Sequence, residues 1–235
     1  MPKKGKNMQT LSNLIARLGG LAAVVGGLLW SVKFFYDRND TPPWPTDLTD
    51  DLFFVVLLLF LSGLVGFYAR LRGRLREWEA VSLVGFVASI CGLIASVVGQ
   101  LTMVLEVGPS WWYGISWWMF VFGYFLANLG LAFVGNSVLQ SGALPRWRAL
   151  PLAIGLLGIL LILVADPPNS ELGIYPALFL WVAYGLGWAV LGYILWFDGD
   201  EAVRRSNGEA SKYTARPARG GSEPAARFTT QRFWR

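Results

Sequence analysis

The feature that most constrains this chain is a series of six long apolar runs. They cover residues 14–36, 52–69, 81–105, 111–139, 149–165 and 174–197, approximately. A helix needs about 20 mostly apolar residues to cross roughly 30 Å of hydrocarbon. Only 15% of the 235 residues are charged, whereas soluble domains carry about a quarter. The sequence therefore predicts an all-α, polytopic membrane protein with six transmembrane helices.

Basic residues fall almost entirely on one side of these predicted spans. Eighteen of the twenty lysines and arginines lie before span one or in its first turn, between spans two and three or four and five, or after span six. Only Lys33 and Arg38 lie on the other side, where the loops are acidic. Because lysine and arginine concentrate in cytoplasmic loops, both termini are predicted to be cytoplasmic, in a bacterial-type plasma membrane.

The same pattern divides the chain into three parts. Residues 1–13 form a basic cytoplasmic N-terminus, residues 14–197 the transmembrane domain, and residues 198–235 a cytoplasmic tail that is rich in Gly, Ser, Ala and Arg. Such a composition predicts disorder. The tail ends in arginines mixed with aromatic residues, and each basic residue near an anionic inner leaflet contributes about 1 kcal/mol of attraction. A solvated terminus is the alternative to a membrane-surface or partner contact through Arg227, Phe228, Arg232, Phe233, Trp234 and Arg235.

Small residues recur at helical spacing in the odd-numbered runs. Examples are the pairs Ala23/Gly27, Gly85/Ser89 and Ala95/Gly99. Small residues four apart let helices approach closely in a bilayer. The even runs are more aromatic, and this alternation is typical of three helical hairpins. We expect the small-residue faces to pack helices together, or to contact other membrane protein subunits.

Tryptophans cluster near the ends of the predicted spans. Trp30 and Trp111 mark the outer ends, while Trp147 and Trp196 mark the inner ends. Indole rings favour the headgroup region. These tryptophans are therefore predicted to anchor the protein at the two interfaces with lipid.

Several kinds of chemistry are excluded by what the chain lacks. It has no histidine and a single cysteine, Cys91. Imidazole haem ligation, most zinc sites, histidine-based triads and an intrachain disulfide are therefore ruled out. No acidic or basic residue lies at the middle of a predicted span, which argues against an ion-coupled pump. We expect no catalytic residue, no metal or cofactor, and no nucleic-acid partner.

A few uncharged polar residues lie deep in the predicted spans. Tyr124 and Asn128 are one helical turn apart in span four, with Tyr184 at similar depth in span six and Ser89 in span three. If these spans are neighbours, the four side chains form a hydrogen-bonded cluster that lines a cavity for an uncharged or lipid-like ligand. The commoner alternative is interhelical packing, in which such contacts contribute about 0.6 kcal/mol each.

Two classes of function follow. The lack of catalytic groups and the abundance of packing faces favour a non-enzymatic membrane protein, as an accessory or structural subunit or a small membrane regulator. The alternative is a transporter, channel, or lipid- or small-molecule-binding protein that uses the Tyr/Asn cluster. A lipid-modifying enzyme would need Arg76, Glu77 and Glu79 at the inner interface, and these are more simply read as a solvated loop.

Overall fold

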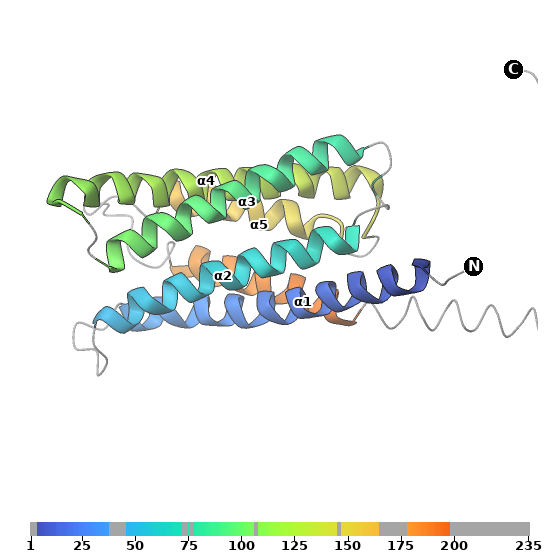
Figure 1. The fold of residues 1–235 in the computed structure, drawn as a ribbon, viewed down its shortest axis with the longest axis horizontal. Coiled ribbons are helices and arrows are strands. Elements are labelled where there is room, and N and C mark those ends of the chain that lie inside the picture. Colours follow the sequence, from blue (N-terminus) through green and yellow to red (C-terminus); the bar gives the residue numbers. More distant parts are fainter. Residues whose placement is uncertain are drawn as a thin grey trace, which may run out of the picture. The chain divides into compact units, whose positions relative to one another are not determined.

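The computed structural model describes residues 4–37, 46–71, 75, 78–105, 108–144, 147–164 and 178–197, and these form six helices and no strand. The helices are α1 (Lys4–Asp37), α2 (Thr46–Leu71), α3 (Glu79–Val104), α4 (Ser110–Ser141), α5 (Leu150–Val164) and an unlabelled sixth helix, Leu178–Phe197, orange in Figure 1. The all-α prediction is confirmed. The predicted tail, 198–235, lies outside the described residues.

Five of the six helices are long and apolar enough to cross a membrane. The exception is α5, whose 15 residues extend only about 22 Å. In α1 the apolar stretch is Thr10–Lys33, but the helix begins at Lys4. Helical structure thus reaches back through most of the segment predicted as the cytoplasmic N-terminus.

Local sequence explains where α4 ends. Gly142 follows Ser141 with a left-handed φ of 64°, and its N–H donates to the Val138 carbonyl oxygen at 3.1 Å. Glycine adopts this conformation without a Cβ penalty, and it is the usual residue after a helix. The chain then turns before α5, in which Pro151 occupies the first turn, where its missing N–H has no helical acceptor to lose.

Each helix packs against the next one along the chain, and the last packs against the first. The adjacent pairs are α1 and α2, α2 and α3, α3 and α4, and α4 and α5. The sixth helix closes the set, because Gly192 faces the backbone at Gly20 of α1 and Gly187 faces Ile154 of α5. In Figure 1, α3, α4 and α5 lie above α1, α2 and the sixth helix. Consecutive helices are therefore neighbours, as the hairpin prediction requires.

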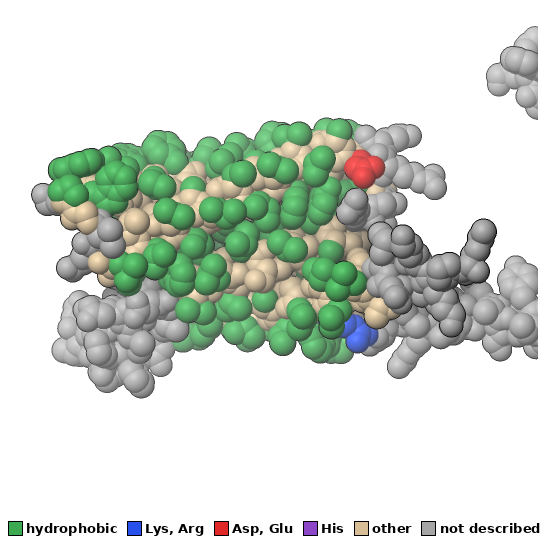
Figure 2. Space-filling view, viewed as in Figure 1, with side chains coloured by type: hydrophobic (Ala, Val, Ile, Leu, Met, Phe, Trp, Pro, Cys, Tyr) green, Lys and Arg blue, Asp and Glu red, His purple; other side chains and the backbone are tan. Residues whose placement is uncertain are grey.

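The described outer surface is apolar along the helices. Val84, Phe122 and Leu163 are 69%, 63% and 71% exposed. In Figure 2 hydrophobic side chains cover the middle of the visible face, and the acidic and basic side chains in view lie toward one end. Soluble proteins rarely expose contiguous apolar patches of more than a few hundred Å². These helices have the lipid-facing surface of an integral membrane protein.

The predicted tryptophan anchors divide into two groups. Trp111, Trp147 and Trp196 are exposed, which is consistent with anchoring at an interface. The prediction for Trp30 was wrong, because this residue is only 1% exposed. It lies on the inward face of α1, where rings of neighbouring helices cover its indole. Trp30 therefore belongs to the core.

Candidate ligand pocket

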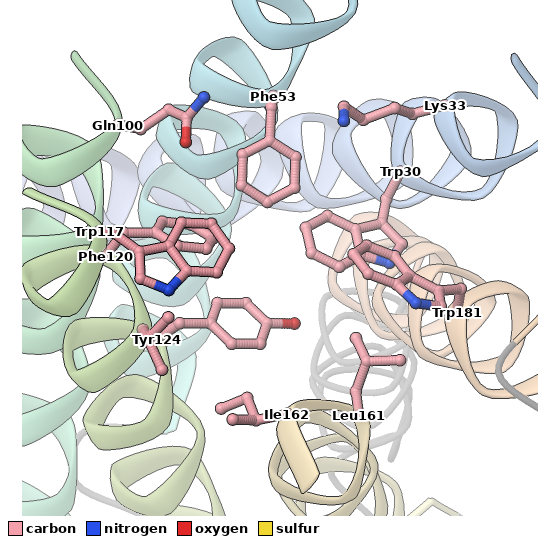
Figure 3. Close-up of a pocket in the computed structure, with 11 residues that line it drawn as sticks. Trp30, Lys33, Phe53, Gln100, Trp117, Phe120, Tyr124, Leu161, Ile162 and Trp181 are labelled. Atoms are coloured by element: carbon pink, nitrogen blue, oxygen red, sulfur yellow. The ribbon is translucent and has the colours of Figure 1, made fainter. Parts of the chain in front are cut away.

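A cavity of about 300 Å³ lies near one end of the six helices. Its lining comes from the C-terminal halves of α1, α3 and α5 and from the N-terminal halves of α2, α4 and the sixth helix, so all six contribute (Figure 3). The lining residues are Trp30, Lys33, Phe53, Gln100, Trp117, Phe120, Val121, Tyr124, Leu161, Ile162 and Trp181. This volume is at the lower end of the range for small-molecule sites.

Aromatic rings form most of the wall of this cavity, and Trp30 is at their centre. Its indole stacks on Tyr124, with ring centroids 5.7 Å apart and planes 6° from parallel. It also stacks on Trp181 at 4.6 Å and contacts Phe53 at 5.1 Å. Aromatic pairs at such separations contribute about 0.5–1.5 kcal/mol beyond the area that they bury. The rings therefore form a rigid wall assembled from four helices.

Two polar groups of this wall have no partner at hydrogen-bond distance among the described residues, although the side chains of Tyr184 and Asn128 lie near one of them, the Tyr124 hydroxyl. They are the hydroxyl of Tyr124 and the indole Nε1 of Trp30, in residues that are 4% and 1% exposed. Figure 3 shows the Tyr124 hydroxyl pointing into the space between the lining side chains. Buried polar groups nearly always have a partner, and an unpartnered one costs about 1–3 kcal/mol. The Tyr124 hydroxyl therefore offers the cavity a hydrogen bond that the described part of the chain does not complete.

Lys33 is the charged residue among those that line the cavity. Its Nζ lies 4.9 Å from the centroid of the Phe53 ring, within range of a cation–π interaction. Figure 3 places Lys33 and Gln100 on either side of Phe53. The polar ends of Lys33 and Gln100 thus lie beside Phe53, and the aliphatic side chains of Leu161 and Ile162 lie across the cavity from it.

The structure brings three of the four polar residues singled out in the sequence together. The Tyr184 hydroxyl donates to Oδ1 of Asn128 at 3.0 Å, and Asn128 Nδ2 donates to the Tyr124 carbonyl oxygen at 2.8 Å. The rings of Tyr124 and Tyr184 meet edge to face at 5.9 Å. Ser89 instead donates to the Ala127 carbonyl oxygen at 2.9 Å, so it links α3 to the backbone of α4.

Only Tyr124 of these four residues lines the cavity. Asn128 and Tyr184 are not among the lining residues. The Asn128 amide packs against Gly158 of α5 so closely that a Cβ at position 158 would overlap the amide. This amide therefore joins α4, α5 and the sixth helix. Ligand binding by these four residues stays a prediction. Their hydrogen bonds are equally those that interhelical packing would produce.

Most of the cavity wall was not foreseen from the sequence. Trp30, Phe120 and Trp181 carry its aromatic surface, yet tryptophan and phenylalanine near a span end are ordinary in membrane proteins. One signal was available for Trp30. It follows Ala23 by seven residues and Gly27 by three, which places it on the small-residue face that packs inward.

The other predicted sites are not assembled in the described residues. The tail residues Arg227, Phe228, Arg232, Phe233, Trp234 and Arg235 lie outside them, as do Arg76 and Glu77. Glu79 is exposed at the start of α3. Within the described ranges no group of histidine, cysteine or acidic residues is placed to hold a metal ion.

Comparison of the chain with protein-family models, with curated proteins and with solved structures gives no match. Function is therefore inferred from the geometry of the cavity and from the apolar helices around it.

Proposed function

We propose that this chain is a six-span integral membrane protein, with both termini in the cytoplasm, that binds one small, uncharged, mostly apolar molecule in its outer half. The observation that carries the proposal is the buried, unpartnered Tyr124 hydroxyl facing an aromatic cavity of about 300 Å³. Ligand sites are mostly apolar, with a few convergent polar groups that orient the ligand. A bound molecule would satisfy this hydroxyl and fill space that packing leaves empty.

The topology is supported by the distribution of charge, and it requires that the short helix α5 crosses the bilayer. The cavity lies at the end of the helices where α1 finishes and α4 begins, which is the end that the basic loops assign to the outside. For α5 to complete a sixth span, its 15 residues require local thinning of the bilayer or help from flanking residues. Such mismatch costs only fractions of a kcal/mol per Å.

A role as an accessory or structural subunit, or as a small regulator, is the weaker candidate. Besides the lack of catalytic groups, it relied on small-residue faces that would be free to meet other proteins. Gly85, Gly92 and Gly99 of α3 instead face the backbone of α4, and Gly20 of α1 faces Gly192 of the sixth helix. These faces hold the chain's own helices together, so a partner would have to dock elsewhere.

Binding is favoured over ion-coupled transport by the chemistry of the lining. Among the described residues that line the cavity, Lys33 is basic and none is acidic. Coupling ions or protons in transporters normally move on intramembrane acidic or histidine side chains. The proposal is therefore a binding site for a neutral molecule.

A pair of leucines on α5 provides a matched test. Leu161 is 2% exposed and lines the cavity, whereas Leu163 is 71% exposed on the outer surface. In Leu161→Trp the larger ring occupies the cavity, while Leu163→Trp adds the same ring to the apolar exterior. Wild type and both variants are purified under mild conditions, and bound small molecules are extracted and identified by mass spectrometry.

We expect a bound molecule from wild type and from Leu163→Trp, and loss of that molecule from Leu161→Trp. If all three proteins yield the same molecules in equal amounts, those molecules are lipids on the outer surface and do not occupy the cavity. Recovery of none from any protein would contradict the proposal. Thermal unfolding of each variant checks that its helices remain packed.

A further inference from the structure

The six helices divide into two groups of three according to how closely their backbones approach. The first trio is α1, α2 and the sixth helix, and the second trio is α3, α4 and α5 (Figure 1). In the first trio, Gly66 of α2 and Gly192 of the sixth helix each face the backbone of α1. In the second, Gly92 of α3 and Gly155 of α5 each face the backbone of α4. Among the described glycines, every one that faces the backbone of another helix does so within its own trio.

Contact between the two trios is made by side chains instead. The rings of Trp30 and Tyr124 stack across the boundary, with centroids 5.7 Å apart. Gly187 of the sixth helix meets the side chain of Ile154 on α5 rather than its backbone. Side chains can change rotamer, and hinge or shear motions occur where elements meet through such contacts. Each trio is therefore a stiff unit, and the boundary between the trios is the softer part of the fold.

The cavity lies on this boundary. Trp30, Lys33, Phe53 and Trp181 belong to the first trio, and the other lining residues belong to the second. Figure 3 shows Trp30 and Trp181 on one side of the space and Tyr124 on the other. Separation of the trios at this end would widen the cavity without disturbing the backbone contacts inside either trio.

The opposite end of the boundary is packed more firmly. Tyr68 of α2 stacks on Phe86 of α3 with ring centroids 4.0 Å apart. Leu71, the last residue of α2, and Leu75, which follows it in the connection to α3, are 0% and 2% exposed. Residues 72–78 join the trios at this end, whereas the longer segment 165–177 joins them at the cavity end. Because a longer segment can span a larger separation, the cavity end is the one that can open.

A hydrogen bond at mid-depth also crosses the boundary. The Tyr184 hydroxyl, in the first trio, donates to Asn128 Oδ1 in the second at 3.0 Å. In contrast, the hydroxyls of Ser12, Ser89 and Ser96 donate to carbonyl oxygens of helices in their own trio. Separation of the trios would therefore break the bond of Tyr184 and leave the three serine bonds intact.

We infer that the two trios move as rigid bodies about the end opposite the cavity, so that they separate at the cavity end and admit the bound molecule. The described arrangement is the closed state, in which rings of both trios meet across the cavity. This inference rests on the proposed binding function for what the opening admits, but the motion itself can be measured without any ligand.

Pairs of nitroxide spin labels on exposed residues measure the separation by pulsed electron paramagnetic resonance. The full-length protein, with Cys91→Ala to remove the native thiol, is placed in lipid nanodiscs. Labels at Val32→Cys on α1 and Tyr113→Cys on α4 report the distance between the trios at the cavity end; the native side chains are 47% and 62% exposed. Labels at Tyr113→Cys and Leu163→Cys, both in the second trio, are the matched control at the same end.

We expect two distances for the pair 32/113, the longer by about 4 Å, since one further layer of atoms needs that much space between the rings. The pair 113/163 should give one distance. Labels at Leu14→Cys and Val84→Cys, on opposite trios at the other end, should also give one. A single distance for the pair 32/113, or the same two populations in either of the other pairs, would overturn the inference.

A conservative substitution tests the hydrogen bond between the trios. Tyr184→Phe removes the bond to Asn128 but keeps the ring, and it should raise the ratio of open to closed populations about threefold, the factor that corresponds to about 0.6 kcal/mol. Ser96→Ala is the matched control, because the Ser96 hydroxyl donates to the Phe120 carbonyl oxygen within the second trio at 3.0 Å. It should leave the ratio unchanged. Equal ratios in the two variants would contradict a boundary between these trios.

Failure of the motion can be distinguished from failure of the binding function. If the pair 32/113 shows two distances but no bound molecule is extracted from wild type, the trios separate and the proposed function is wrong. If a molecule is extracted from wild type and lost in Leu161→Trp, while the pair 32/113 keeps a single distance, the binding site stands and the motion is refuted.

Discussion

Replacing Gly92 by alanine should force α3 and α4 apart. A Cβ at this position would lie 2.9 Å from the α-carbon of Ala127, and closer still to the Ala127 amide nitrogen and the Gly123 carbonyl oxygen. Ordinary Cβ contacts begin at 3.4 Å, and all three obstructing atoms belong to backbone rather than to a side chain that can rotate. The helices must therefore separate by at least about half an ångström.

The cost follows from the contacts that this separation loosens. A gap of about 0.5–1 Å forfeits a quarter to a half of the dispersion attraction of each contact, and inserting a methyl group into a packed core costs about 1–3 kcal/mol. The Ser89 hydroxyl, 2.9 Å from the Ala127 carbonyl oxygen, would lose a bond worth about 0.6 kcal/mol. We expect Gly92→Ala to lower the free energy of unfolding by about 2 kcal/mol.

The assay is reversible unfolding in mixed micelles with increasing sodium dodecyl sulfate, followed by far-ultraviolet circular dichroism. Gly114→Ala on α4 is the matched control, because a Cβ there has no atom within 4 Å. Its stability should equal or slightly exceed that of wild type, since alanine is the better helix former. If Gly92→Ala unfolds at the same detergent fraction as Gly114→Ala, the close approach of α3 and α4 is refuted.

Two further predictions concern the polar cluster and the topology. A double-mutant cycle of Asn128→Leu and Tyr184→Phe should give a coupling energy of about 0.6 kcal/mol for the bond between the Tyr184 hydroxyl and Asn128, and zero coupling would show that the two do not interact. In whole cells, a membrane-impermeant maleimide should label Thr41→Cys, because residue 41 lies in a loop on the acidic, outer side. The same reagent should label Ser206→Cys only after the membrane is opened, because residue 206 follows span six on the inner side. In the parent protein Cys91, on the lipid-facing side of α3, should stay unlabelled, and labelling of Ser206→Cys in intact cells would contradict a cytoplasmic C-terminus.

The helical elements could be predicted from hydrophobicity with little error. The predicted run 149–165 corresponds to Leu150–Val164, and the run 81–105 to Glu79–Val104. The first helix was underestimated, since it begins at Lys4 in a polar segment where hydropathy gives no signal. Polar residues can continue a helix into water, because its backbone bonds are satisfied within the helix in either solvent.

The positions of the polar residues along their helices and the grouping of Tyr184 with Asn128 were anticipated, but the individual hydrogen bonds were not. A rise of about 1.5 Å per residue places Tyr124 and Asn128 one turn apart at the middle of α4. That the Tyr184 hydroxyl reaches Asn128 Oδ1, while Ser89 turns to a backbone carbonyl, depends on how the sixth helix and α3 are rotated about their axes. No local pattern in the sequence specifies those rotations.

Trp30 shows most clearly what only the tertiary structure decided. Its place near the end of an apolar run made it look like an anchor among lipid headgroups, yet the core encloses it. Sequence alone determined that six segments are apolar helices and that basic residues gather in alternate loops, because the transfer of a segment out of water depends mainly on its own composition. Which faces meet depends on the fit of side chains between helices: glycines bring α3 close to α4, and rings from four helices surround one cavity. Such contacts join residues far apart in the chain, so the cavity became visible only once all six helices were assembled.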